Sequence, residues 1–461
     1  MSFIKDLKKK NVLILGAGKT GLATAFFLIG KVKNILLSER GYEKENIKNQ
    51  IAALKNAGVK VEFEQNSENF ISQADLVVIS PGISPYSEIV KKITAKHLSI
   101  ISDIELAQYF SNTPIIAVTG TNGKTTTTSL ITHLINNSGK KAIACGNIGN
   151  PLIEIIKNNE DKDIDYFVLE ISSFQIFYSP TLSPEIAICL NITPDHLDWH
   201  GNMENYIAAK KKLFLQQNKN SWAILNFSDN VLKDFNLKNK ILYFSSEIKD
   251  SDVLKKHSYF AFFENNYLKI KQNDNIQELI NKNDLRILGL HNIENALAAI
   301  ACAKIIDVNN DAIKDGLKTF QGVEHRLEFI KKANNKAYYN DSKATNPEAT
   351  IKAIEAFKGK KITLILGGKD KNTSLEQMIK TIKENVDEVI LFGEAKDRFL
   401  SELNKNSYNK VKIVTDLKEV VKTSLDSKTE IVLFSPACAS FDMFKNYEER
   451  GKLFKEFVYK Y

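Results

Sequence analysis

Residues able to bind a phosphate group stand together at positions 114–128, which read PIIAVTGTNGKTTTT. The β-branched run 115–118 predicts a strand that ends at Gly120, and a helix-compatible stretch begins near Lys124. A glycine turn between a strand and a helix presents backbone N–H groups and a positive helix end to an anion. The Lys124 ammonium can reach terminal phosphates, and the Thr125 hydroxyl can ligate Mg²⁺.

This loop departs from the strict G-x-x-x-x-G-K-[ST] pattern, because Val118 stands where the first glycine is expected. The pattern still favours a nucleoside triphosphate site. The alternative is a Gly- and Thr-rich turn that only starts a helix.

A second glycine turn opens the chain, where Gly16, Gly18 and Gly21 form G-x-G-x-x-G between a strand-like and a helix-like run. Glu39 follows Gly21 by eighteen residues, close to the position of a ribose-binding carboxylate in a dinucleotide site. The pattern alone leaves three interpretations open: a dinucleotide site, a site for another nucleotide, and a purely structural turn.

Carboxylates and imidazoles follow two strand-like runs of the middle segment. Glu170 ends the run YFVLE, where it can ligate Mg²⁺ or polarise a water, or simply be solvated. The stretch NITPDHLDWHG (191–201) gathers Asp195, His196, Asp198 and His200. Such a loop suits a divalent metal or a phosphate, and a structural role is the alternative.

Basic residues mark three further places. Lys210, Lys211 and Lys212 lie on a predicted helix (206–214), where the pattern by itself favours a solvated basic face. Arg326 stands in EHR at a predicted domain junction, and its guanidinium can donate two parallel hydrogen bonds to a phosphate. NDSKATNP (340–347) places Asp341 and Lys343 on a strand-to-helix turn, and SPACASFDMFKNYEERG (435–451) follows another strand.

Alternating strand and helix patterns position these residues, and they fall into three segments: 1–108, 109–321 and 322–461. The alternation predicts an α/β protein with parallel sheets whose ligands bind at the carboxyl ends of strands. We expect a Rossmann-like first domain, a central P-loop domain with a parallel sheet, and a Rossmann-like third domain with an open parallel sheet. The polar stretch 216–283 is assigned to the central domain with short strands such as WAILN (222–226).

Composition limits the classes of protein. The 461 residues exceed one ordinary core, and 43% hydrophobic with 26% charged residues is a globular balance. The net charge of +8 comes from dispersed lysines, so nucleic-acid binding is not favoured. Four cysteines without metal-binding spacing are expected to be free and buried. With no signal-peptide core or membrane-span pattern, the sequence predicts a cytoplasmic protein without a membrane partner.

Taken together, these motifs resemble the Mur ligases, the ATP-dependent amide-bond ligases of peptidoglycan precursor synthesis. GTNGKTTT, HNIENALAA and EHR are similar to motifs of the whole family. LEISSFQ, NDSKATNP and the long SPACASFDMFKNYEERG resemble the member that adds D-glutamate to UDP-N-acetylmuramoyl-L-alanine. The resemblance implies ATP and Mg²⁺ as cofactors, an acyl-phosphate intermediate and two small-molecule substrates, and we expect a monomer.

The resemblance also implies roles for particular residues. The implied ATP-binding residues are Gly120, Thr121, Asn122, Gly123, Lys124, Thr125, Thr126, Asn292, Asn295, Arg326, Asp341 and Lys343. Two Mg²⁺ ions are implied, with Thr125 and Glu170 at the first, and with His196 and a carbamylated Lys210 at the second. The implied contacts of the UDP substrate are Lys19, Thr20, Ser38, Glu39, Arg40, Ser80, Gly82 and Asn147, and those of D-glutamate are Thr345, Lys371, Ser435 and Phe441. Lys124, His196 and Lys210 are the implied catalytic residues, and Lys369 is the alternative to Lys371.

Three competing interpretations remain at this stage. The first is another ligase of the same family that adds a different amino acid or acts on folate. An NAD-dependent oxidoreductase built on the first domain leaves GTNGKTTT and NDSKATNP unexplained. A nucleotide-binding regulatory protein without catalysis leaves Glu170, His196 and Lys210 without a purpose.

Overall fold

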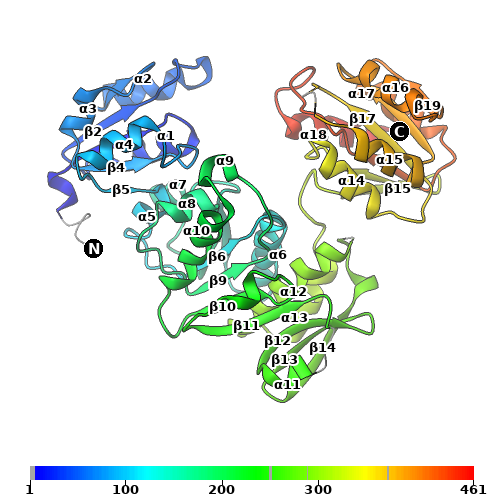
Figure 1. Cartoon of the computed structure of the whole chain (residues 1–461), viewed down its shortest axis with the longest axis horizontal. Helices are drawn as coiled ribbons and strands as arrows, with labels where there is room; N and C mark the ends of the chain where they lie inside the picture. Colours follow the sequence, from blue (N-terminus) through cyan, green and yellow to red (C-terminus); the bar gives the residue numbers. More distant parts are fainter. Residues whose placement is uncertain (1–5, 249–251, 288, 371–372) are drawn as a thin grey trace. The chain divides into compact units, whose positions relative to one another are not determined.

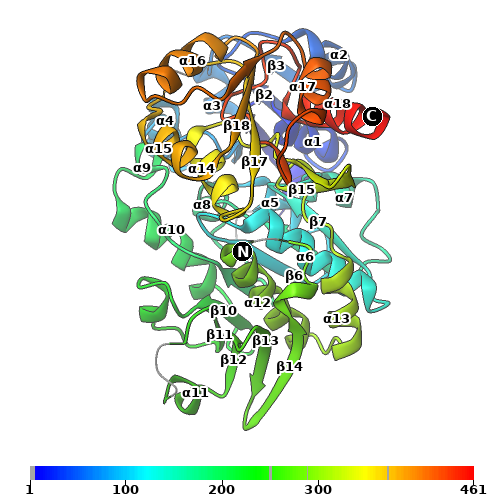
Figure 2. The same ribbon diagram turned by 90° about the vertical axis from the view of Figure 1, so that its right-hand side faces the viewer.

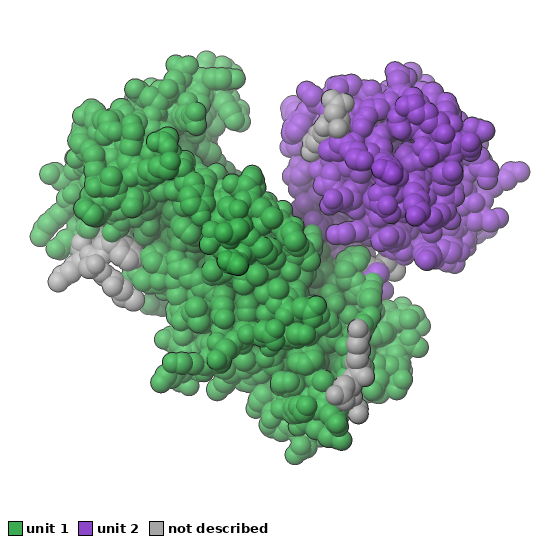
Figure 3. All heavy atoms as spheres, in the orientation of Figure 1, with its two compact units in different colours: residues 1–284, 290–318 green, residues 285–289, 319–461 purple. Residues whose placement is uncertain are grey.

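The computed structural model describes residues 6–248, 252–287, 289–370 and 373–461. These residues form three sheets (Figure 1), mostly of parallel strands, as the α/β prediction requires. The chain divides into two compact units, 1–284 with 290–318 and 285–289 with 319–461 (Figure 3). Unit 1 contains the first two sheets and unit 2 the third. The predicted domain boundaries at 108 and 321 stay a prediction.

The first sheet is parallel, with strand order β3-β2-β1-β4-β5. Its strands are almost wholly apolar where they are buried, as expected when helices cover both faces. Its elements, in chain order, are η1 (Leu7–Lys9), β1 (Asn11–Leu15), α1 (Lys19–Leu28), β2 (Asn34–Ser38), η2 (Glu45–Ile47), α2 (Lys48–Asn56), β3 (Lys60–Glu62), α3 (Glu68–Gln73), β4 (Leu76–Ile79), α4 (Glu88–Ala95), β5 (Ile100–Ile101) and α5 (Asp103–Ala107).

The second sheet has nine strands in the order β14-β13-β12-β11-β10-β9-β6-β8-β7. Its first elements are β6 (Ile115–Thr119), α6 (Lys124–Asn137), β7 (Ala142–Gly146), α7 (Leu152–Lys157), β8 (Tyr166–Glu170), α8 (Ser173–Phe177), β9 (Ile186–Cys189), α9 (Leu197–His200), α10 (Met203–Leu215), β10 (Trp222–Asn226), η3 (Leu232–Asp234) and β11 (Lys240–Ser245). The predicted strands in this part, WAILN included, are confirmed.

The far edge of this sheet departs from the parallel prediction, because β13 pairs antiparallel with both of its neighbours. The elements there are α11 (Asp252–Lys256), β12 (Tyr259–Glu264), β13 (Tyr267–Gln272), β14 (Asn275–Asn281) and η4 (Lys282–Asp284), followed by α12 (Leu290–Ile305) and α13 (Asn310–Thr319). Helix α12 packs on α6 (Figure 2) and covers the sheet beside the phosphate loop.

The third sheet has the order β15-β16-β20-β17-β18-β19, and only the β15–β16 pair is antiparallel. Its elements are β15 (Glu328–Ala333), β16 (Lys336–Asn340), α14 (Pro347–Glu355), β17 (Ile362–Gly367), α15 (Glu376–Asn385), β18 (Glu388–Phe392), α16 (Lys396–Lys405), β19 (Val411–Ile413), α17 (Leu417–Leu425), β20 (Ile431–Phe434) and α18 (Tyr447–Lys460). The predicted open parallel sheet is therefore confirmed, with one antiparallel pair at its edge.

The four cysteines are free and buried, as the sequence predicts. Within the described ranges, no helix combines the length and apolar character that a membrane span requires.

Candidate active site

The loop between β6 and α6 has the backbone of a phosphate cradle. Gly120 and Gly123 have φ angles of +147° and +85°, which favour glycine. A Cβ atom on Gly123 would lie 2.4 Å from Oδ1 of Asn295, so α12 closes on the loop at this point. The Lys124 ammonium donates to the carbonyl oxygens of Gly120 (2.9 Å) and Thr121 (2.8 Å), which keeps this charge beside the loop.

The segment after β9 holds this loop in place. The backbone N–H of Asn122 donates to Oδ1 of Asn191 (2.8 Å), and the Asn191 amide returns a bond to the Asn122 carbonyl oxygen (3.2 Å). The Thr121 hydroxyl lies 2.9 Å from the Tyr206 hydroxyl. Sequence reasoning missed Asn191 and Tyr206, although both stand in segments (191–201 and 206–214) that it singled out.

Glu170 ends β8 directly beside the loop strand β6, where it pairs in register with Val118. Its side chain is buried, and Oε1 accepts a hydrogen bond of 2.8 Å from Nδ2 of Asn147. Among the described residues, Oε2 is buried without any hydrogen-bond partner. A buried, unpaired carboxylate oxygen is costly, so this atom fits a bound cation.

Lys210 lies on α10, which is capped at its N-terminus by Asn202, whose side chain accepts from the Asn205 N–H. Only 1% of Lys210 is exposed, so it does not belong to a solvated face. Its ammonium donates to the Gly120 carbonyl oxygen (3.1 Å) and the Thr119 hydroxyl (3.3 Å), so it touches the phosphate loop. Burial lowers the pKa of Lys210 to about 7, because the charged form loses its hydration.

The two histidines of the segment 191–201 lie in different environments, one exposed and one buried. His196 is half exposed, with Nε2 3.3 Å from Oδ2 of Asp195. His200 is buried, and Nε2 lies 2.9 Å from the Ser173 hydroxyl. Burial also lowers the pKa of His200 to about 4, so it is a neutral core residue. Within the described part of the chain, no three His, Cys, Asp or Glu side chains form a metal cluster, so the metal or phosphate site expected at this loop stays a prediction.

The two predicted ATP contacts of α12, Asn292 and Asn295, lie where this helix packs on α6. Thr127 donates to Oδ1 of Asn295 (3.1 Å), and the Asn295 amide donates to Oδ1 of Asn292 (3.0 Å). Both side chains are buried beside the phosphate loop. Their contact with ATP stays a prediction, and Asn295 bonds directly to the helix that follows the loop.

The first domain brings its predicted substrate residues to the carboxyl edge of its sheet. Glu39 accepts from the N–H groups of Ala17 and Gly41, both at 2.8 Å. Ser80 approaches Gly16 so closely that a Cβ there would lie 2.3 Å from its hydroxyl oxygen. Lys19 donates to the Gly149 carbonyl oxygen (2.8 Å), which joins the first domain to the central one within unit 1.

The other residues predicted to contact the substrate at this edge differ in their exposure. Arg40 and Gly82 are exposed, and Thr20 is half-buried. Ser38 is buried, and its hydroxyl bonds to Glu62 (2.6 Å) and Asn66 (2.8 Å), so its side chain is used internally.

In unit 2, the turn 340–345 meets the segment after β20. The Ser435 hydroxyl donates to Oδ2 of Asp341 at 2.7 Å, and Oδ1 of Asp341 accepts from the Leu327 N–H at 3.2 Å. Burial raises the pKa of Asp341 to about 7. Lys343 donates its N–H to the His325 carbonyl oxygen (3.0 Å), which ties the turn to the EHR motif.

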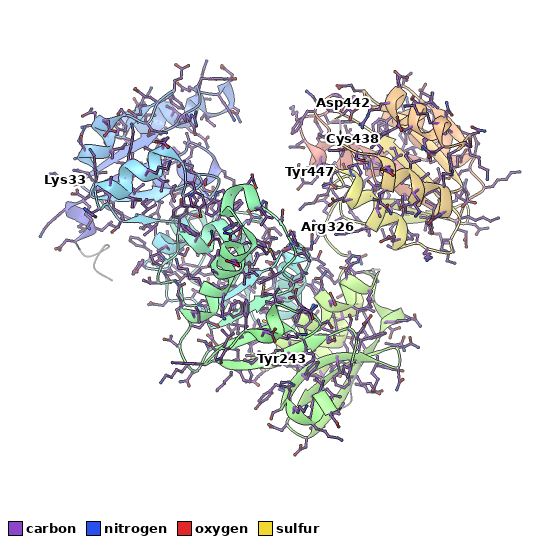
Figure 4. The ribbon with its side chains drawn as sticks, in the orientation of Figure 1. Lys33, Tyr243, Arg326, Cys438, Asp442 and Tyr447 are labelled. Atoms are coloured by element: carbon purple, nitrogen blue, oxygen red, sulfur yellow. The ribbon has the colours of Figure 1, made fainter. Side chains whose placement is uncertain are left out.

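Arg450 is a further residue of this cluster that the sequence did not reveal. Its buried guanidinium donates to the Ser342 carbonyl oxygen (2.7 Å) and to the Cys438 carbonyl oxygen (3.0 Å), so it fixes both segments. Arg326, Cys438 and Tyr447 are marked in Figure 4, and all belong to unit 2. Thr345 is half-buried and Phe441 is 66% exposed, whereas Lys371 lies outside the described residues.

Comparisons with known proteins agree over the whole chain. The family models described as "Mur ligase MurD-like, N-terminal domain", "Mur ligase middle domain" and "Mur ligase, glutamate ligase domain" match residues 10–102, 118–303 and 325–438. Proteins named UDP-N-acetylmuramoylalanine--D-glutamate ligase from Thermoanaerobacter pseudethanolicus and Clostridioides difficile are each 39% identical to this chain. Both alignments cover 98% of this chain and 99% of the relative.

Solved structures support the fold. The UDP-N-acetylmuramate-alanine ligase MurC of Thermotoga maritima is 19% identical, with a TM-score of 0.58 over 98% of this chain and 99% of that chain. The MurF ligase of the same organism, in complex with ADP, is 17% identical, with a TM-score of 0.57 over 99% and 96%.

Proposed function

The chain belongs to the Mur ligase family, and we propose that it joins D-glutamate to UDP-N-acetylmuramoyl-L-alanine during the synthesis of peptidoglycan precursors. As a family member it is an ATP-dependent ligase that forms an amide bond. The observation that carries the choice of substrates is the match at 39% identity over 98% of the chain to relatives named for this reaction.

The proposed reaction has two steps. A carboxylate oxygen of the alanyl group attacks the γ-phosphorus of ATP, which breaks the bond to ADP and leaves an acyl phosphate. The free amine of D-glutamate then attacks the acyl carbon, phosphate departs with the C–O bond electrons, and the nitrogen loses a proton. Activation is needed because a carboxylate otherwise has oxide as its leaving group.

The chain's own groups assist these steps by position and charge. The N–H groups of the Gly120–Thr126 loop and the Lys124 ammonium are suited to the phosphates of ATP. Holding a nucleophile and an electrophile in the correct geometry lowers the activation barrier by roughly 7–11 kcal/mol. The Asn191 and Tyr206 contacts supply this rigidity to the loop.

Mg²⁺ is proposed at two sites. The unpartnered Oε2 of Glu170 supports a first site with the Thr125 hydroxyl. For the second site we propose His196 and a carbamate formed when the neutral Lys210 amine adds CO₂ and releases a proton. The lowered pKa of Lys210 supports this step, because only the neutral amine is nucleophilic. When bound, the ions would neutralise phosphate and carboxylate charge.

The remaining assignments stand as proposals from the resemblance. Lys19, Thr20, Glu39, Arg40, Ser80, Gly82 and Asn147 are proposed for the UDP substrate, with Ser38 acting through its internal bonds. Asn292, Asn295, Arg326, Asp341 and Lys343 keep their predicted role toward ATP. Thr345, Ser435, Phe441 and Lys371 keep theirs toward D-glutamate. A cytoplasmic monomer is also proposed; light scattering after gel filtration tests the monomer.

One assay tests the proposal. Purified protein receives UDP-N-acetylmuramoyl-L-alanine, MgATP and one amino acid at a time, and phosphate release is measured. We expect release that depends on D-glutamate. Release that depends instead on L-lysine, or no release with any amino acid, would overturn the proposal.

A further inference from the structure

The turn that carries Arg326 has an unusual backbone conformation. His325 has a φ angle of +64° and Leu327 a φ angle of +43°, so left-handed residues other than glycine stand on both sides of Arg326. Such a conformation is unfavourable for a residue with a Cβ atom, and it persists only where the surrounding contacts impose it. The contacts that impose it are therefore part of how Arg326 is presented.

Polar contacts of Glu328 and Asn340 fix the left-handed His325. The His325 N–H donates to Oε2 of Glu328 at 2.9 Å. Nδ2 of Asn340 lies 2.9 Å from Nδ1 of His325 and donates to the same Glu328 oxygen at 3.0 Å. One oxygen of the Glu328 carboxylate is thus used to hold the turn, and its other oxygen remains for a second partner.

Helix α18 packs directly on this turn. Gly451 approaches the His325 ring so closely that a Cβ atom there would lie 2.3 Å from Nδ1. Lys455 follows Gly451 by four residues, so both lie on the same face of the helix. The helix therefore brings a cation to the turn from a segment 131 residues beyond Glu324.

The Lys455 ammonium pairs with both carboxylates that flank Arg326 in the sequence. It donates to Oε1 of Glu324 (2.6 Å) and to Oε1 of Glu328 (2.8 Å). Only 19% of the Lys455 side chain and 17% of the Glu328 side chain are exposed, so water and salt screen this pair little. The hydrogen bond from Lys455 also lowers the pKa of the Glu324 carboxyl, which keeps this group ionised at neutral pH.

Arg326 itself has no carboxylate partner. Its side chain is exposed, and among the residues that the structure describes no acidic group forms an ion pair with its guanidinium. The charge of Arg326 acts on Asp341, but both Asp341 oxygens bind other donors, the Leu327 N–H and the Ser435 hydroxyl. A guanidinium binds phosphate through two parallel N–H groups, and a carboxylate would compete for the same fork.

We propose that Lys455 is a positioning residue: by binding Glu324 and Glu328, it keeps both carboxylates away from Arg326, so that the guanidinium stays available for a phosphate of ATP. This inference rests on the proposed function, which assigns Arg326 to ATP by resemblance. Lys455 acts through Arg326 and not on the nucleotide. Helix α18 thereby supports nucleotide binding by neutralising the charge beside the turn.

Titration calorimetry of the full chain with the magnesium complex of a non-hydrolysable ATP analogue tests the proposal. Lys455→Met removes the ammonium and keeps an unbranched side chain, so Glu324 becomes able to pair with Arg326. Competition from one surface ion pair should weaken binding about two- to fivefold at low salt, and the ratio should shrink at high salt because exposed charges are screened. Lys455→Arg keeps a cation and should bind nearly as the unsubstituted protein does. Lys460→Met changes an exposed lysine of the same helix and is the matched control.

A second substitution separates this role from a purely structural one. Glu324→Gln added to Lys455→Met removes the released charge, while Glu328 stays engaged through its other oxygen. The double variant should therefore regain the affinity of the unsubstituted protein, whereas a turn that has simply loosened would not recover. The KM for ATP in phosphate release should follow the same order, and the KM for the UDP substrate should stay unchanged.

The outcomes for Lys455 and for the proposed function are distinct. Equal affinity of Lys455→Met and the unsubstituted protein overturns the role of Lys455, as does a loss that Glu324→Gln does not restore. Binding of the analogue does not depend on which amino acid is added. Tight binding without release that depends on D-glutamate therefore overturns the proposed function, and the calorimetric comparison still decides on Lys455. An unsubstituted protein that does not bind the analogue overturns both.

Discussion

The Ser435 hydroxyl donates a 2.7 Å hydrogen bond to Oδ2 of Asp341 inside unit 2. The family resemblance implies different ligands for these two residues, ATP for Asp341 and D-glutamate for Ser435. Their side chains are both buried, and the same contact joins the strand ends of β16 and β20. One hydrogen bond therefore joins the two predicted ligand contacts.

Stability should depend on pH through Asp341. Burial raises its pKa from 3.8 to about 7, so between these values the unfolded chain is ionised there while the folded chain holds a proton. The free energy of unfolding therefore falls as pH rises from about 4 to about 7, at up to roughly 1.4 kcal/mol per pH unit. Asp341→Asn removes this contribution, so its stability relative to the unsubstituted protein should improve from pH 5 to pH 8.

Urea unfolding at several pH values measures this difference. Asp397→Asn, which changes an exposed carboxylate of the same unit, is the control and should show no such trend. A difference between Asp341→Asn and the unsubstituted protein that stays constant over this range would contradict the assignment.

The phosphate loop should tolerate no side chain at Gly123. Gly123→Ala combines a left-handed φ of +85° with a clash at 2.4 Å against Oδ1 of Asn295. Gly139, just beyond the end of α6, has a φ of +88°, and a Cβ atom added there would have open space around it to 4 Å. Gly139→Ala should therefore cost only the backbone strain, about 1–2 kcal/mol, and Gly123→Ala clearly more.

A double-mutant cycle isolates the clash. Adding Asn295→Ala to Gly123→Ala should recover part of the lost stability, although Asn295→Ala alone destabilises by removing its bonds to Thr127 and Asn292. Denaturant unfolding gives the four free energies. Strictly additive values would show that the contact between α12 and the loop is not tight.

The sequence predicts those parts of the fold whose strands are continuous apolar runs. The runs before Gly120 and Glu170 are buried strands between helices, so length and composition identify them. Strand β13 has a different pattern, because Lys269 and Lys271 interrupt it and are nevertheless buried. Lys269 is compensated by Glu264 (3.1 Å) and Glu278 (2.8 Å) on neighbouring strands. Such pairing depends on tertiary structure and cannot be read from one segment.

The same distinction applies to the candidate site. Lys124 is predictable because its loop is continuous in sequence. Asn191 lies 69 residues from the N–H group that it binds, and Arg450 lies 108 residues from Ser342. The sequence pattern of a single segment does not indicate contacts between residues that are so far apart in the chain. Lys210 is distinguished in the sequence only by resemblance, since the three lysines in a row look alike until burial separates them.

Glu170→Gln should weaken the dependence of activity on Mg²⁺. The substitution removes the charge of the unpartnered oxygen and keeps an acceptor for Asn147. We expect the Mg²⁺ concentration for half-maximal phosphate release to rise at least about tenfold. Without Mg²⁺ the variant should be at least as stable as the unsubstituted protein, because an unpaired buried charge is gone. Glu204→Gln, an exposed change on α10, should alter neither property. An unchanged Mg²⁺ requirement would remove Glu170 from the metal site.

Lys210→Ala should lose nearly all activity, about 10²-fold or more, because a carbamate would no longer form beside the phosphate loop. A short carboxylate such as acetate should restore part of it. Lys210→Arg keeps a positive charge but cannot add CO₂, so it should be as inactive as Lys210→Ala. Lys211→Ala is the matched control, because Lys211 lies next in the chain and packs over the Phe235 ring at 5.0 Å instead.

A readout independent of activity comes from ¹³C NMR with ¹³C-labelled bicarbonate. The carbamate forms from the neutral amine, and the neutral fraction of Lys210 rises as pH increases through about 7. A carbamate resonance should therefore strengthen from pH 6 to pH 8 in the unsubstituted protein and in Lys211→Ala, and be lost in Lys210→Arg. If Lys210→Ala retains full activity, the carbamate has no part in the reaction, and the buried amine serves only to hold Thr119 and Gly120.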